Sequence, residues 1–270
     1  GIILMALALA GLQFLVQLLP EYGARLPMLG LGLFTVAAAT AFVWWEKRCA
    51  QALIPLDMFR NPSVVIFCLL SFFLGFIMFA LLIYIPLLLQ GGFGLTAREV
   101  GVLITPLVLS ITVGSIASAR IITRMRRPER ILHIGFTFLL VCGAGLLFVW
   151  ADTPRIVLIV CLSGCGIGLG VLMPNITVFI QELVKRSQLG ISTALMQSTR
   201  MVGGMVGTAI IGSIINHYYV ERVRELDVSK FPNPAWLAGL EDPQVLVSAH
   251  VQSAFIGVLQ RVGLHGETFI

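Results

Sequence analysis

The amino-acid sequence predicts an all-α fold, a polytopic transmembrane helix bundle, and three observations support this class. Apolar residues make up 58% of the 270 positions and charged residues only 11%, with a mean hydropathy of +0.97. Soluble globular proteins carry roughly 25% charged residues, so this chain has too few charges to cover a surface in water. Its apolar residues also gather in stretches of about 20, the length of a helix that crosses ~30 Å of hydrocarbon.

Seven such stretches follow one another, and each ends at proline, at charged residues or at both. They are Gly1–Leu19, Met28–Trp45, Val64–Leu89, Val100–Ile122, Leu132–Trp150, Ile156–Gln181 and Gly190–Asn216. The third is longer than the hydrocarbon requires, so we expect it to tilt or to project beyond it. Its five phenylalanines could receive flat lipophilic drugs, but we expect a lipid-facing stripe; they are Phe67, Phe72, Phe73, Phe76 and Phe79.

The connecting loops alternate in charge, which predicts their orientation. The second, fourth and sixth loops hold nine basic residues: Lys47, Arg48, Arg60, Arg124, Arg126, Arg127, Arg130, Lys185 and Arg186. The other three hold only Arg25, Arg98 and Arg155. Because cytoplasmic loops carry the excess of Lys and Arg, the first helix should run from the inside to the outside.

The chain ends suggest a fragment of a longer protein. Gly1 already lies in a helical stretch, and the number of stretches is odd. After Asn216 the sequence becomes polar, and Val245–Val262 is helical in pattern but too polar to span, so we place it at the outer surface. A natural start at the first helix would instead suit a seven-helix receptor, which is the competing architecture.

Several motifs then resemble one family. Residues 55–61 read Pro-Leu-Asp-Met-Phe-Arg-Asn, residues 84–90 read Tyr-Ile-Pro-Leu-Leu-Leu-Gln, and Gly94-Leu95-Thr96-Ala97 precedes Gly101 and Pro106. Together with residues 166–174 and 190–207, they resemble the fourteen-helix drug:proton antiporter branch of the major facilitator superfamily. Two departures are a basic loop, 120–130, without the usual Gly and Asp, and Ser192-Thr193 in place of Ala-Ser-Gly.

The resemblance implies a domain plan and a function. Residues 1–62 would hold two linker helices and a cytoplasmic loop, 63–217 five helices of the C-terminal bundle, and 218–270 an extracytoplasmic segment. The expected activity is export of lipophilic or cationic drugs across the inner membrane in exchange for protons, by alternating access. A metabolite or siderophore exporter of the same fold is the alternative. Expected partners are the bilayer, the substrate, protons, the missing N-terminal helices and a periplasmic adaptor protein.

Charged residues inside the stretches are rare. None of the thirteen acidic residues lies deep in one, so the proton-coupling carboxylate is expected outside this chain. Arg200 lies ten residues past Gly190, about 15 Å along a helix, with Gln197 on the same face. A deep arginine costs at least ~2.5 kcal/mol unless it finds a polar partner, so Arg200 either lines the substrate pathway or snorkels or pairs helices.

The remaining candidates are polar, glycine and proline positions. Asn175, Gln13 and Gln17 could line the pathway or bond between helices. Pairs of small residues four apart predict close helix packing, a hinge or both, at Gly166 and Gly170 and at Gly203 and Gly207. Pro174 removes the hydrogen bond to the carbonyl of Gly170, and Pro106 interrupts the fourth stretch in the same way.

Other classes of function find no support in the residues. The five cysteines are odd in number and mostly lie in apolar runs, which favours buried thiols over disulfides, and Cys161 with Cys165 has no His or Asp neighbour to complete a metal site. Glycines 164–170 lack the spacing and the strand of a nucleotide-binding loop. No clustered catalytic residues suggest an enzyme, and no metal, cofactor or nucleic acid is expected.

Overall fold

The computed structural model describes residues 4, 6–8, 10–15, 26–46, 48, 56–150 and 153–224, and these form helices and no strand. The main helices are α2 (Leu26–Glu46), α3 (Pro62–Gly91), α4 (Ala97–Ile122), α5 (Arg130–Leu146), α6 (Arg155–Leu183) and α7 (Leu189–Arg224). Short 3-10 turns, Leu56–Arg60 and Arg186–Gln188, precede α3 and α7. The all-α prediction is confirmed.

The predicted spans differ in length. Four helices are long and apolar enough to cross a bilayer: Pro62–Gly91, Ala97–Ile122, Arg155–Leu183 and Arg186–Ile215. The other apolar helices in the described chain are shorter: Ala6–Leu15, Leu29–Trp45 and Arg130–Leu146. That the shorter helices also span the bilayer stays a prediction for this part of the chain.

Helix α5 ends at Leu146, whereas the predicted apolar stretch continued to Trp150. The backbone N–H groups of Leu147, Phe148 and Val149 each donate to a carbonyl three residues back, so the last turn tightens and the α-helix stops. The 17 residues of α5 cover about 25 Å, slightly less than the hydrocarbon thickness.

At the other end of the chain α7 is longer than expected. It continues past Asn216 to Arg224, while its apolar part ends at Ile215. Residues 218–224, which the sequence assigned to an extracytoplasmic segment, thus extend the helix. The proposed surface helix Val245–Val262 lies outside the described residues.

The turn between α3 and α4 is fixed by local chemistry. Gly94 adopts a φ of 63°, a conformation that costs little only without a Cβ. Thr96 then caps α4, because its hydroxyl accepts from the N–H of Glu99 while the Glu99 carboxylate accepts from the N–H of Thr96 at 3.0 Å. Glu99 also pairs with Arg155 at 3.3 Å, which links the first turns of α4 and α6.

We expect the Thr96→Ala variant to unfold more easily by about 1 kcal/mol, because removing a capping side chain leaves a helix N–H group without its acceptor. The measurement is the thermal unfolding midpoint of the purified protein in detergent. Thr105→Ala is the matched control, since Thr105 is exposed in the same helix and bonds only to the carbonyl of Gly101. Equal midpoints for the two variants would contradict the capping role.

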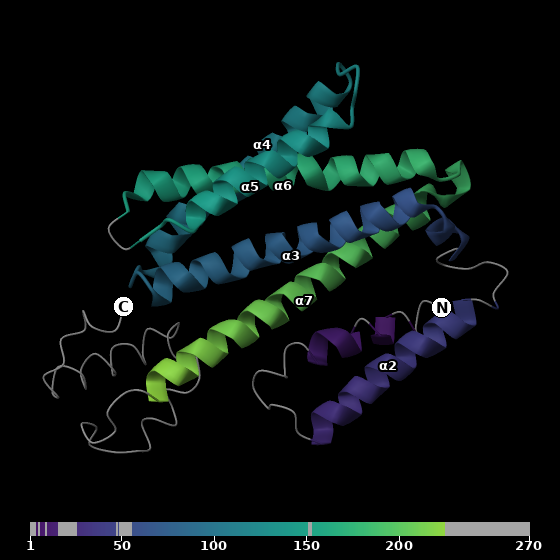
Figure 1. Ribbon diagram of the computed structural model, residues 1–270, viewed down its shortest axis with the longest axis horizontal. Coiled ribbons are helices and arrows are strands. Elements are labelled where there is room, and N and C mark those ends of the chain that lie inside the picture. The colour runs from purple at the N-terminus through teal and green to yellow at the C-terminus, as the bar shows by residue number, and fades with distance from the viewer. Residues whose placement is uncertain are drawn as a thin grey trace, which may run out of the picture.

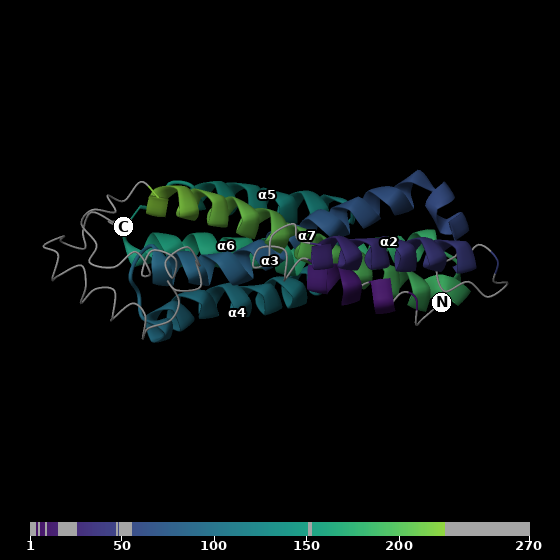
Figure 2. The same cartoon turned by 90° about the horizontal axis from the view of Figure 1, so that it is seen from below.

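Helix α6 occupies the centre of the bundle. It packs most extensively against α4 and α5, while α3 packs most extensively against α7 (Figure 1). Seen from below, α2 lies in front of this group with the N-terminal helical residues beside it (Figure 2). In the α3–α7 pair, Ser71 donates to the carbonyl of Met196 and Tyr84 to that of Thr208, so the two helices run in parallel.

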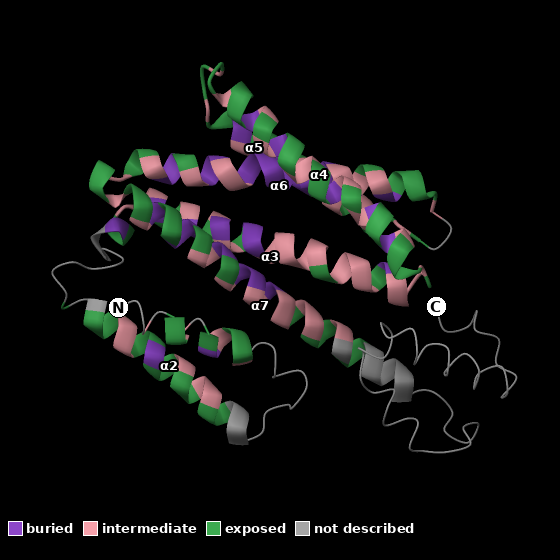
Figure 3. Ribbon diagram, turned by 180° about the vertical axis from the view of Figure 1, so that it is seen from behind, coloured by how far each residue is buried: buried purple, intermediate pink, exposed green. Residues whose placement is uncertain are grey.

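The burial pattern is that of a helix bundle with apolar outer faces. Buried residues gather on α6 and on the sides of its neighbours that face it, whereas the outer faces of α4 and α5 are exposed (Figure 3). Large apolar side chains stand on those outer faces, including Leu140, 75% exposed, and Val102, 65% exposed. Such surfaces suit hydrocarbon rather than water.

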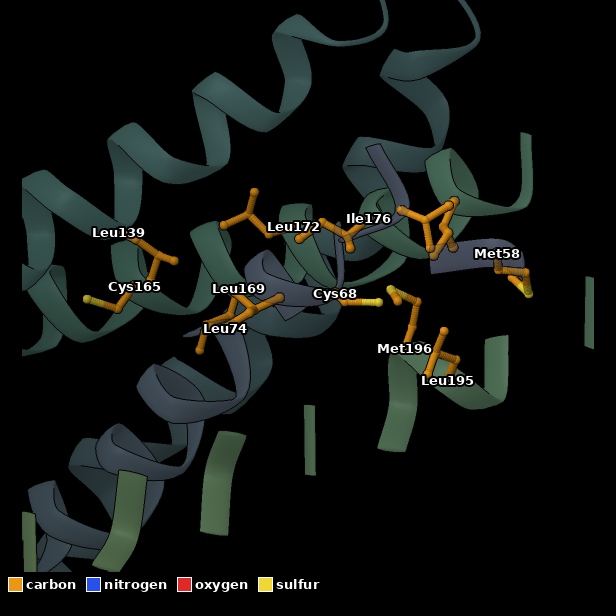
Figure 4. Close-up of a cluster of buried hydrophobic side chains, with 12 residues drawn as sticks. Met58, Cys68, Leu74, Leu139, Cys165, Leu169, Leu172, Ile176, Leu195 and Met196 are labelled. Carbon is orange, nitrogen blue, oxygen red and sulfur yellow. The ribbon is translucent and has the colours of Figure 1, made fainter. Parts of the chain in front are cut away.

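The largest apolar core joins four helices. Leu169, Leu172 and Ile176 of α6 lie at its centre, between Leu139 of α5, Leu74 of α3 and Met196 of α7 (Figure 4). Cys68 and Cys165 belong to this core as buried thiols, and the four described cysteines form no disulfide.

Candidate functional site

Polar groups gather where the first half of α7 faces the second half of α6, close to Pro174. Pro174 has no N–H and therefore removes the helical hydrogen bond to the carbonyl of Gly170. Three side chains near it donate to other carbonyls of α6: Asn175 to Val171 at 2.6 Å, Thr177 to Met173 at 3.1 Å, and Arg200 to Met173 at 3.3 Å. Only the last of these bonds joins two helices.

Arg200 is the most unusual residue of this polar group. Its side chain is 6% exposed. One terminal nitrogen donates to the amide oxygen of Gln197 at 3.2 Å and the other to the carbonyl of Met173, while Nε is buried without an acceptor. The guanidinium therefore reaches the neighbouring helix, as the helix-pairing alternative expects. Whether it also lines a pathway stays a prediction.

The charge of Arg200 is not balanced within the described residues. Its acceptors are neutral, and no carboxylate of this part of the chain pairs with it. The acidic residues of the candidate spans, Glu99 and Glu182, lie at helix ends. A buried charge without an opposite charge costs several kcal/mol, so this arrangement needs a functional reason or a partner from elsewhere.

A line of polar side chains continues from Arg200 along α6 and α7. We call it the polar seam, and it consists of Thr177, Gln181, Thr193, Gln197 and Arg200. Gln181 of α6 donates to Thr193 of α7 at 2.7 Å, so the two helices are joined by side chains at two levels. Thr193 and Gln197 are exposed, in contrast to the apolar outer faces elsewhere.

Behind Arg200, α3 and α7 approach each other through glycines. A methyl group on Gly75 would overlap the backbone carbonyl of Arg200, and one on Gly203 would overlap that of Phe72. The phenylalanines of α3 take part, because Gly207 packs on the ring of Phe76 and Gly204 on that of Phe79. The expected lipid-facing stripe is thus wrong for these rings, although Phe73 is 57% exposed.

The other predicted glycines and prolines lie on the opposite side of α6. A methyl group on Gly166 would overlap the carbonyl of Leu107, and one on Gly170 that of Ile111, so both glycines allow α4 to approach closely. Pro106 precedes this contact within α4. The packing is visible in the structure, while a hinge role stays a prediction.

The structure does not bring all predicted polar residues together. Asn175 is buried but bonds within its own helix, one turn from the seam. Gln13 is exposed in the N-terminal helical residues, which lie beside α2 and apart from the polar seam (Figure 1). Gln17 lies outside the described residues.

Sequence reasoning missed the acceptor of Arg200 and the pairing of Gln181 with Thr193. Pro174 was no signal for the first, because the carbonyl that it leaves unpaired belongs to Gly170 and not to Met173. No single-sequence signal identified the second.

A shallow apolar groove of about 440 Å³, lined by residues such as Pro86, Val100 and Thr105, lies between α3 and α4 away from this site. Among the described residues no cluster of three could hold a metal ion.

Comparison with known proteins assigns the fold to a family. Residues 21–208, more than half of the chain, match the Major Facilitator Superfamily. The chain belongs to this superfamily. Its members are transporters rather than enzymes, so the chain is a multi-pass membrane protein in contact with the bilayer. The receptor alternative is therefore excluded.

Relatives within the superfamily carry the names of drug and antibiotic transporters. The chain is 28% identical to the multidrug transporter protein MdtP of Bacillus subtilis, over 69% of its own length and 35% of that protein. It is 25% identical to the tetracycline resistance determinant of Streptomyces rimosus, over 80% of the chain and 62% of that protein. It is 26% identical to the methylenomycin A resistance protein of Streptomyces coelicolor, over 80% of the chain and 46% of that protein. The chain thus spans about a third of MdtP and less than two thirds of the others.

Proposed function

We propose that this superfamily member is the C-terminal part of a secondary exporter in the cytoplasmic membrane. The complete protein would expel lipophilic, often cationic compounds in exchange for protons by alternating access. The observation that carries the proposal is the polar seam with its buried Arg200 in an otherwise apolar bundle, together with similarity to a multidrug transporter and to two antibiotic resistance proteins.

The proton-binding group of this exporter would come from the rest of the protein. Coupling needs a carboxylate that changes charge where access alternates. The described spans hold acidic residues only at their ends, and the chain covers about a third of MdtP. The missing N-terminal helices would supply the carboxylate, and a periplasmic adaptor protein could extend the export route, as the resemblance to related exporters implies.

The polar seam would face the central cavity between the two halves of the complete transporter. In superfamily transporters the two halves rock against each other around a central site. The exposed polar side chains of α7, Thr193 and Gln197, suit a water-lined cavity, because acyl chains offer them no hydrogen bonds. We place the seam on the cavity side, with Arg200 near the middle of the slab.

Cells that express the full-length protein are expected to accumulate less ethidium than cells with an empty vector, and a protonophore should remove the difference. Ethidium fluorescence in loaded cells measures this directly. Efflux that persists unchanged after the protonophore would contradict proton coupling. Efflux of a metabolite in the absence of any ethidium efflux would instead favour a specific metabolite exporter of the same fold.

A further inference from the structure

The buried guanidinium of Arg200 has unused donors. Arginine carries five N–H groups in a planar fork, and the described residues accept from two of its three nitrogens. The third, Nε, has no acceptor although the side chain is 6% exposed. Leaving such a donor unpaired in a buried site is costly, so the geometry is incomplete without a further acceptor.

The acceptor that Arg200 lacks has a definable chemistry. A planar fork binds a planar, bidentate anion best, which is the shape of a carboxylate. A single negative charge also matches the single positive charge, since the other basic residues of the described spans lie at the helix ends. A doubly charged phosphate would leave one charge uncompensated inside the bilayer.

Gln197 is the side chain that an incoming carboxylate would have to move to reach the guanidinium of Arg200. Its amide oxygen holds one terminal nitrogen of Arg200 at 3.2 Å, but its side chain is exposed, unlike Arg200 itself. Its exposed amide can therefore rotate away from Arg200 without itself becoming buried. The carbonyl of Met173, by contrast, is fixed in the backbone of α6 and keeps the guanidinium in place.

We propose that Arg200 and Gln197 form a carboxylate-binding site in the polar seam, in which the Gln197 side chain moves aside and the incoming carboxylate accepts from the guanidinium fork at Nε, the donor left without an acceptor. The inference rests on the proposed function, because that places the seam on the cavity side. The carboxylate has two sources to distinguish: an acidic side chain from the rest of the protein, and an anionic substrate.

The test uses the purified full-length protein and two probes, 1-pyrenebutanoate and its uncharged methyl ester. If the carboxylate belongs to a substrate, the native protein binds the acid at least tenfold more tightly than the ester by fluorescence titration, and Arg200→Gln removes this preference. Arg155→Gln is the matched control, because Arg155 is an exposed arginine at the end of α6 and should leave the preference unchanged.

If the carboxylate belongs to the protein, native protein shows no preference between the probes, but Arg200→Gln lowers ethidium export at least tenfold. A second substitution of an Asp or Glu by its amide, selected for restored export, should then recover it. Native-like export by Arg200→Gln, together with no preference for the acid, would overturn the site. If native protein exports no ethidium, the proposed function fails while the site is decided by probe binding alone.

If Arg200→Gln fails to fold, the variant Arg200→Lys tests the proposed site instead. Arg200→Lys keeps the charge and loses the fork, so it should reach the membrane and still lose at least threefold in acid preference or in ethidium export. A lysine variant that equals the native protein in both measurements would also overturn the proposal.

Discussion

The Gly203→Ala variant is expected to lose most of its folded protein, although it adds a single methyl group. That methyl would overlap the backbone carbonyl of Phe72, and neither helix can remove the overlap by rotating a side chain. Helices α3 and α7 would have to move apart, which loosens the Ser71–Met196 bond and the core around Leu74. Overpacking of this kind costs about 1–3 kcal/mol or more, which corresponds to roughly 3–10 °C in the thermal unfolding midpoint.

The measurement is the midpoint in detergent together with the amount of protein in the membrane. Gly75→Ala should behave alike, because its methyl would overlap the carbonyl of Arg200 on the other side of the same crossing. Gly143→Ala is the control: it lies inside α5, and nothing is within 4 Å of the added methyl group. Alanine also favours a helix over glycine there, so a midpoint at or above the native one is expected. If Gly203→Ala matched this control, the α3–α7 contact would be looser than the structure shows.

Much of this fold could be predicted because hydrophobicity and loop charge are local signals. The apolar stretches found the helices, and Gly203 with Gly207 marked a packing face before any partner was known. The ends were harder, since α5 stops where its last N–H groups bond three residues back, and α7 continues to Arg224 through polar residues. Helical hydrogen bonding at those ends does not follow the hydropathy of the side chains.

The candidate site could be predicted only in part. Arg200 stood out because a deep charge is costly, and Gln197 followed from helical spacing. Their partner, the carbonyl of Met173, is a backbone group on another helix, and no pattern of side chains reveals which helix lies opposite. For the same reason Gln13 and Asn175, which are equally polar in sequence, were grouped with Arg200 although they lie elsewhere.

The second large effect concerns two glycines of α6 with different kinds of neighbour: Gly170 faces α4 and Gly164 faces α5. A methyl on Gly170 would overlap the backbone carbonyl of Ile111, and a methyl on Gly164 would overlap the thiol sulfur of Cys142 just as severely. A backbone carbonyl moves only with its helix, whereas a cysteine side chain can change rotamer. Gly170→Ala is therefore expected to lower the unfolding midpoint by roughly 3–10 °C, and Gly164→Ala by much less.

The stability lost in Gly164→Ala, unlike that lost in Gly170→Ala, should be recovered by a second substitution. Because the most severe overlap in Gly164→Ala is with the Cys142 sulfur, adding Cys142→Ala should recover most of the lost midpoint, which a double-mutant cycle measures as a coupling between the two positions. No side-chain truncation on α4 should rescue Gly170→Ala, since the atom in the way belongs to the backbone. Equal losses for Gly164→Ala and Gly170→Ala, with no rescue of either, would mean that α6 packs against α4 and α5 with the same rigidity. The distinction between backbone and side-chain contacts would then not govern the stability of this bundle.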